Sequence, residues 1–109
     1  MEWHHLVSCF FAGLVLTNAL PHLISGVRGE PFQTPFAKPR GVGLSSSTVN
    51  VLWGLLNLVI AYVLIFRVGD FDLRNTQDAM AFGVGMLAMG LFCARHFGRF
   101  HGGRAVDQA

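Results

Sequence analysis

Charged residues are scarce in this chain: lysine, arginine, aspartate and glutamate together make up 13% of its 109 residues. Soluble domains usually carry about 25%. Three stretches, 3–27, 49–66 and 79–94, contain no charged residue at all. Because a short chain buries only a modest share of its surface, this much apolar surface excludes an ordinary water-soluble domain. The net charge of +2 is too small, and its basic residues too scattered, to predict binding to nucleic acid.

Cysteine is also scarce, since Cys9 and Cys93 are the only two in the sequence. Both lie inside uncharged stretches rather than in the polar segments where a disulfide framework is usually built. We therefore expect two small, buried, apolar side chains and no disulfide bond.

The three uncharged stretches, together with their polar flanks, are long enough to cross a membrane as helices, which takes about 20 residues at about 1.5 Å per residue. The sequence thus predicts an all-α polytopic membrane protein, with residues 1–109 as a single transmembrane domain. The predicted spans are about 3–27, 48–68 and 77–97. No basic residue precedes the first stretch, so we expect it to be kept as a helix rather than removed as a signal peptide.

The segment between the first two spans, residues 28–47, is predicted to be a loop rich in proline and glycine. Pro31, Pro35 and Pro39 recur at four-residue spacing and exclude a regular helix. Three spans place this loop and the C-terminus on the same side of the membrane.

That side carries six of the eight basic residues, which are Arg28, Lys38, Arg40, Arg95, Arg99 and Arg104. Arg67 and Arg74 lie on the other side with the N-terminus. Because cytoplasmic loops carry the excess of lysine and arginine, we expect a cytoplasmic loop and C-terminus and an N-terminus outside. The expected location is the inner membrane of a bacterial cell.

A set of short motifs runs through the first two spans and the loop. They are Asn18-Ala-Leu-Pro-His22, Phe32 followed by Thr34-Pro-Phe-Ala37, Ser45-Ser46, and Asn50-Val-Leu-Trp-Gly54 with Asn57. In these the chain resembles a group of small bacterial integral membrane proteins of uncharacterised function, over roughly residues 4 to 100. The resemblance implies the membrane-spanning fold and carries no implication of activity, cofactor or partner.

Polar residues inside the uncharged stretches are costly in lipid and often functional. On the first span, Asn18 and His22 are four residues apart and share a helical face. On the second, Asn50 and Asn57 are seven apart and share a face as well. Counting the helical rise puts His22 and His96 at similar depth, about 27 and 28 Å from the outer ends of their helices. All five residues therefore fall in the predicted cytoplasmic half.

Two interpretations of these residues stay open. They either line a polar, cytoplasm-facing pocket or hold neighbouring helices together by hydrogen bonds. For the pocket, the candidate ligand-binding residues are Asn18, His22, Asn50, Asn57, Arg95 and His96.

No catalytic residue, metal site or cofactor is expected. His22 and His96 could approach one another from two helices, but no helix carries an H-x-x-x-H or E-x-x-H pair. All six acidic residues lie outside the uncharged stretches, so no buried carboxylate is expected as a metal ligand or for proton coupling.

Small residues recur along the third span, as in helices that approach one another closely in membranes. They are Ala79, Ala81, Gly83, Gly85, Gly90 and Ala94. The sequence favours a non-enzymatic accessory or structural membrane protein that assembles with itself or with a larger membrane partner. A small transporter or channel protomer, and a membrane cofactor protein or enzyme using His22 and His96, are the alternatives.

Overall fold

The computed structural model describes residues 2–107 and consists mostly of helix. Its elements are α1 (Glu2–Val27), β1 (Phe32–Gln33), β2 (Leu44–Ser45), α2 (Ser47–Val63), the π-helical turn η1 (Leu64–Val68), α3 (Thr76–His101) and α4 (Gly103–Asp107).

Three segments are long and apolar enough to cross a membrane: Trp3–Val27, Ser47–Val68 and Thr76–His101. The predicted all-α fold with three spans is confirmed. The third helix continues to His101 instead of stopping near residue 97, because Gly102 is the first residue there to adopt a left-handed conformation and end the helix.

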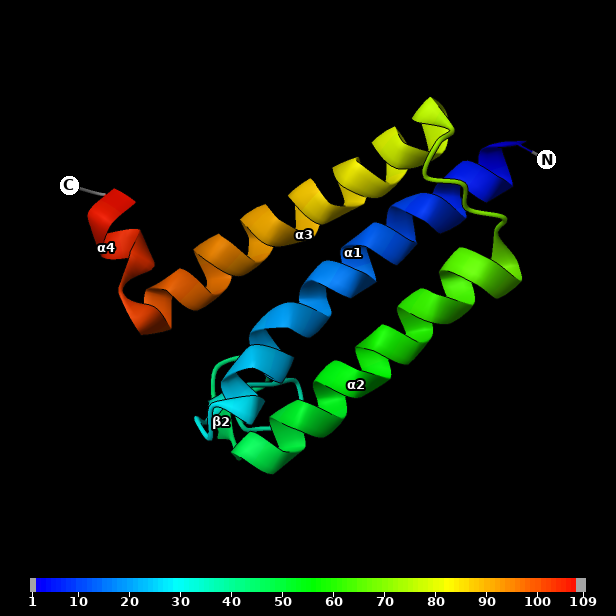
Figure 1. Ribbon diagram of the computed structural model, residues 1–109. Helices are drawn as coiled ribbons and strands as arrows, with labels where there is room; N and C mark the ends of the chain where they lie inside the picture. The colour runs from blue at the N-terminus through cyan, green and yellow to red at the C-terminus, as the bar shows by residue number, and fades with distance from the viewer. Residues whose placement is uncertain (1, 108–109) are drawn as a thin grey trace.

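The three long helices lie side by side, with α1 in the middle (Figure 1). Helices α2 and α3 each pack along α1 and make almost no contact with each other. The molecule measures 40 × 34 × 22 Å, so it is thin in one direction.

Glycines set the close contacts of α1 with its neighbours. A side chain at Gly13 or at Gly85 would overlap backbone atoms of the facing helix, α3 or α1 respectively. Gly54 of α2 also lies close to the α1 backbone, although less tightly, since a side chain there would come within 2.8 Å of the Leu23 backbone nitrogen. Small residues at these positions let the backbones approach, which is how helices gain packing energy in lipid.

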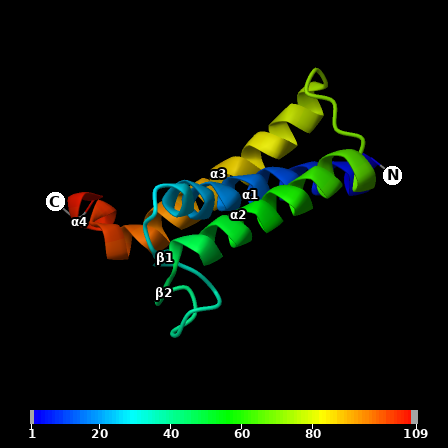
Figure 2. The same ribbon diagram turned by 60° about the horizontal axis from the view of Figure 1, so that its bottom comes forward.

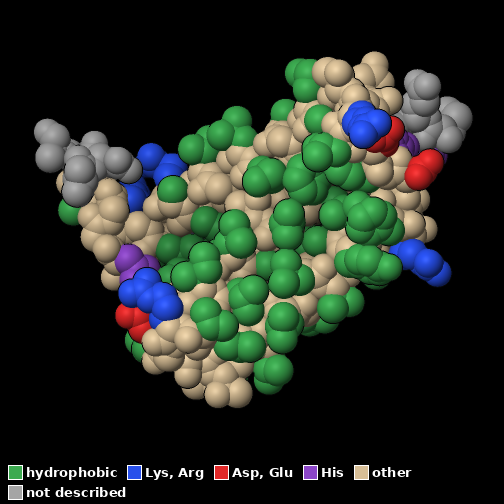
Figure 3. Space-filling view, in the orientation of Figure 1, with side chains coloured by type: hydrophobic (Ala, Val, Ile, Leu, Met, Phe, Trp, Pro, Cys, Tyr) green, Lys and Arg blue, Asp and Glu red, His purple; other side chains and the backbone are tan. Residues whose placement is uncertain are grey.

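The surface is apolar around its middle and charged at its ends. In Figure 3, hydrophobic side chains cover the central part of the visible face, whereas charged side chains and histidines gather toward the two ends of the helices. Several polar side chains are buried instead, among them Asn50, His22 and Asp78, at 0, 2 and 4% exposure. A soluble domain shows the reverse arrangement, so lipid is the solvent this surface suits.

The segment joining α1 to α2 folds back under the ends of the helices, as Figure 2 shows. Its strands β1 and β2 form an antiparallel pair in which Phe32 faces Ser45 and Gln33 faces Leu44. Ser46 then caps α2 by accepting a hydrogen bond from the Val49 backbone. The proline-rich loop is therefore a compact structure attached to the bundle.

Candidate functional site

The loop end of the bundle contains a buried hydrogen-bond network centred on Asn50 of α2. His22 of α1 donates from Nδ1 to Asn50 Oδ1 at 2.9 Å, since an amide oxygen can only accept. The Asn50 amide nitrogen lies within hydrogen-bonding distance of the carbonyl oxygens of Phe32 (3.2 Å), Ser45 (3.2 Å) and Ser46 (3.0 Å). One side chain thus joins α1, α2 and both strands of the loop.

A second polar link joins α1 to α2 closer to the middle of the bundle. Asn18 donates to the Asn57 amide oxygen at 3.1 Å, and Asn57 in turn donates to the Trp53 carbonyl oxygen at 2.8 Å. The amide oxygen and the amide nitrogen of Asn57 therefore both have partners, which matters in a region that contains little water.

Two histidines of α3 hold the loop from the opposite side. His96 donates from Nε2 to the Gly41 carbonyl oxygen at 2.6 Å. His101 donates a hydrogen bond from Nε2 to the Gln33 amide oxygen at 2.8 Å. Its ring also stacks on the Phe32 ring, with 4.8 Å between the two centroids. The loop is thereby fastened to α3 as well as to α1 and α2.

A cavity of about 350 Å³ lies between these links, bordered by α1, α2, α3 and the loop. Asn18, His22 and His96 line it, and Phe97 contacts both histidine rings. The indole nitrogen of Trp53 is buried beside the cavity and has no hydrogen-bond partner within residues 2–107.

The predicted binding residues thus divide into three groups. Asn18, His22 and His96 share the cavity, whereas Asn50 and Asn57 are buried and do not line it. Arg95 does not line the cavity but lies in an open groove of α3 that adjoins it and shares Phe92 and His96 with it.

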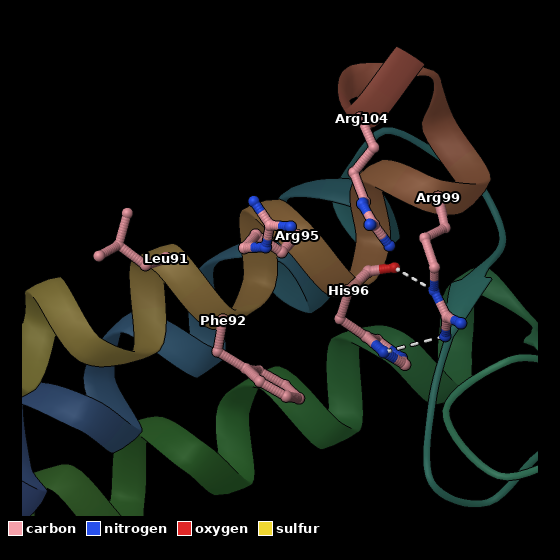
Figure 4. Close-up of a pocket in the computed structure, with 6 residues that line it drawn as sticks. All are labelled: Leu91, Phe92, Arg95, His96, Arg99 and Arg104. Carbon is pink, nitrogen blue, oxygen red and sulfur yellow. Dashed lines mark hydrogen bonds between the residues drawn. The ribbon is translucent and has the colours of Figure 1, made fainter. Parts of the chain in front are cut away.

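That groove has a volume of about 490 Å³ and is distinctly basic. Arg95 and Arg99 project from the last turns of α3, and Arg104 reaches back from α4 (Figure 4). Arg99 also contacts the free ring nitrogen of His96 at 3.3 Å. Among the described residues that line the groove there is no acidic side chain.

A different cluster occupies the opposite end of the bundle, where α1 begins and α3 begins. His5 Nε2 lies 2.8 Å from Asp78 Oδ1 and 3.7 Å from Cys9 Sγ. The other ring nitrogen of His5 accepts a hydrogen bond from the Asp70 backbone at 3.1 Å, and Asp78 Oδ2 accepts one from the Asp72 backbone at 3.0 Å. The cluster is therefore held by the 69–75 connection as well as by the two helices.

The expectation that no carboxylate is buried was wrong, because Asp78 is only 4% exposed. Asp78 lies in the first turn of α3, where an acidic side chain also complements the helix dipole, so its place in the sequence does not by itself indicate burial. The signal that could have revealed the contact is the four-residue spacing of His5 and Cys9, which puts both on one face of α1 at the depth where α3 begins.

The chain matches no family model, no curated protein and no solved structure.

Proposed function

We propose that this chain is a non-enzymatic, accessory or structural protein of a bacterial inner membrane, which assembles with itself or with a larger membrane partner. Its loop and C-terminus face the cytoplasm. The polar residues at the loop end support a structural role, because their hydrogen-bonding groups are used within the protein. They bond to one another and to backbone carbonyls, and they are His22, Asn50, Asn18 and Asn57. Such bonds hold helices together in lipid.

The observation that carries the assembly proposal is the uncovered face of α3. A side chain built at Gly83 would meet no atom within 4 Å, and one at Gly90 would meet only Thr17, at 4.0 Å. The two glycines are seven residues apart and so lie on one face of the helix. Gly85, in contrast, is already used against α1. The Gly83 face therefore offers the close backbone approach that helix pairs in membranes use.

Replacing Gly83 with leucine is expected to reduce the oligomeric or partner-bound fraction, because the larger side chain prevents close approach of another helix. Native mass spectrometry from mild detergent measures copy number and partner together. The matched control is Ala88→Leu, an exposed position about 140° around the same helix. An unchanged distribution for Gly83→Leu, or an equal loss for both variants, would refute assembly through this face.

The basic groove favours a second candidate function, the binding of an anionic lipid headgroup. Arg95, Arg99 and Arg104 present three guanidinium groups at one end of a membrane helix, and arginine pairs with phosphate oxygens in a bidentate manner. Basic pockets beside membrane helices commonly bind headgroups of this kind.

Replacing Arg95 or Arg104 with glutamine is expected to lower the affinity for anionic lipid about fivefold each, since one basic residue near the membrane surface contributes about 1 kcal/mol. The measurement is the number of phosphatidylglycerol molecules that the protein retains in native mass spectra, compared with the number of phosphatidylcholine molecules retained under the same conditions. Arg74→Gln, at the other end of the bundle, serves as the control. Equal retention of both lipids, or equal effects at Arg74, would contradict a headgroup site.

A further inference from the structure

The cluster of His5, Cys9 and Asp78 brings three different donor atoms to one point. The imidazole nitrogen, the thiol sulfur and the carboxylate oxygen all lie within 4.8 Å of one another. Cys9 and Asp78 are buried, at 1 and 4% exposure. The two helices that supply them are held in register by the close contacts at Gly13 and Gly85, so the donors do not depend on flexible segments.

The arrangement differs from a nucleophile activated by a histidine and an acid. In such a triad the acid and the nucleophile contact opposite nitrogens of the imidazole. Here Cys9 and Asp78 both face Nε2 of His5, while Nδ1 accepts the Asp70 backbone N–H. Three donors that face one shared point suit a single bound cation.

We propose that His5, Cys9 and Asp78 form a binding site for a divalent transition metal ion, with Zn²⁺ as the ion that the donors favour. Thiolate and imidazole are ligands of zinc, whereas Mg²⁺ and Ca²⁺ take oxygen ligands almost exclusively. Zinc bonds of 2.0 to 2.3 Å in tetrahedral geometry place neighbouring donors roughly 3.3 to 3.8 Å apart. The His5–Cys9 separation of 3.7 Å fits this range, the His5–Asp78 separation of 2.8 Å must widen slightly, and the Cys9 and Asp78 donors lie within 4.8 Å of each other.

The charges in the site also suit a divalent ion. A thiolate and a carboxylate together carry two negative charges, so the loaded site is neutral. Neutrality is favourable at the edge of a membrane, where an unbalanced buried charge is costly. His5 is 26% exposed, so the ion has a path from solvent, and a water molecule completes the coordination.

Loading the site moves two protons. The Cys9 thiol loses its proton to solvent as the sulfur–metal bond forms. The proton on His5 Nε2 is displaced and the ring takes one up at Nδ1, so the imidazole stays neutral. An Nδ1–H can no longer accept from the Asp70 backbone, and that 3.1 Å hydrogen bond is broken. Metal binding is thereby coupled to the 69–75 connection.

Cobalt titration of the purified, metal-free protein in detergent tests the site. We expect Co²⁺ to bind at one per chain with a thiolate-to-cobalt absorption band and the visible bands of four-coordinate cobalt, and Zn²⁺ to displace it. Cys9→Ala, His5→Ala and Asp78→Asn are each expected to weaken binding by at least about 100-fold, because even loss of an outer-shell partner costs 10- to 100-fold.

The chain supplies a matched control for each ligand: Cys93→Ala, His4→Ala and Asp70→Asn should all retain the bands. A cobalt spectrum without a thiolate band, or one that survives Cys9→Ala, would overturn the proposal. If His5→Ala or Asp78→Asn fails to fold, the proposal is tested instead in the Cys93→Ala variant, by measuring whether Zn²⁺ protects the Cys9 thiol from chemical labelling. Zn²⁺ should then slow maleimide labelling of Cys9 and speed hydrogen exchange at the Asp70 amide, and the absence of both effects would leave only a hydrogen-bonded link between α1 and α3.

Discussion

Replacing Asn50 with alanine is expected to lower the free energy of unfolding by about 2 to 3 kcal/mol, since each buried polar group left without a partner costs about 1 to 3 kcal/mol. The change removes the acceptor for His22 Nδ1 and the two amide N–H groups that lie within reach of three loop carbonyls. Unfolding of the detergent-solubilised protein by increasing fractions of sodium dodecyl sulfate gives the measurement. Limited proteolysis should show faster cleavage within residues 28–47.

Asn57→Ala is the matched control for that prediction, because it changes the same residue type on the same helix. Asn57 makes a single link to α1, through Asn18. Its loss should cost about 0.6 kcal/mol, the average for side-chain bonds between membrane helices, and leave cleavage of the loop unchanged. Equal destabilisation by the two variants would show that Asn50 does not hold the loop.

Replacing Gly85 with alanine is expected to separate α1 from α3 and to destabilise the protein by about 3 kcal/mol, the upper end of the usual cost of overpacking. A methyl group there would overlap the carbonyl oxygen of Phe10 and press on the backbone of Leu14. Backbone atoms cannot move aside as a flexible side chain can. The same detergent unfolding experiment measures the loss.

Gly83→Ala provides the comparison from two residues away on the same helix. A methyl group at Gly83 meets no atom within 4 Å, and alanine favours helix over glycine by about 0.5 to 1 kcal/mol. We therefore expect unchanged or slightly higher stability. If Gly85→Ala were tolerated as well as Gly83→Ala, the close contact between α1 and α3 would be refuted.

Much of the fold follows from local features of the sequence. The scarcity of charge and the length of the three uncharged stretches predict the spans, and Ser46 and Asn75 cap the helices at positions where the sequence offers hydroxyl and amide groups. These features act within one helix or at its ends. They need no knowledge of which helix packs on which.

The sites were predicted less completely because they depend on contacts between elements. Depth along the helices correctly predicts that Asn18, His22 and His96 lie near one another. It cannot distinguish residues that line the cavity from Asn50 and Asn57, which are buried and do not line it. Arg95 lies at nearly the same depth as His96, but its side chain does not line the cavity. The His5 and Asp78 contact joins residues 73 positions apart, and a carboxylate that begins a span has the same sequence pattern whether it faces solvent or another helix.

The central position of α1 has a consequence for biosynthesis. The ribosome delivers the N-terminal segment first, so α1 reaches the bilayer ahead of α2 and α3. Since α2 and α3 pack on α1 and barely on each other, each newly made helix finds its docking surface already present. Co-translational insertion can then proceed without rearranging earlier segments, and the pairing of Asp78 with His5 is made only when the last helix arrives.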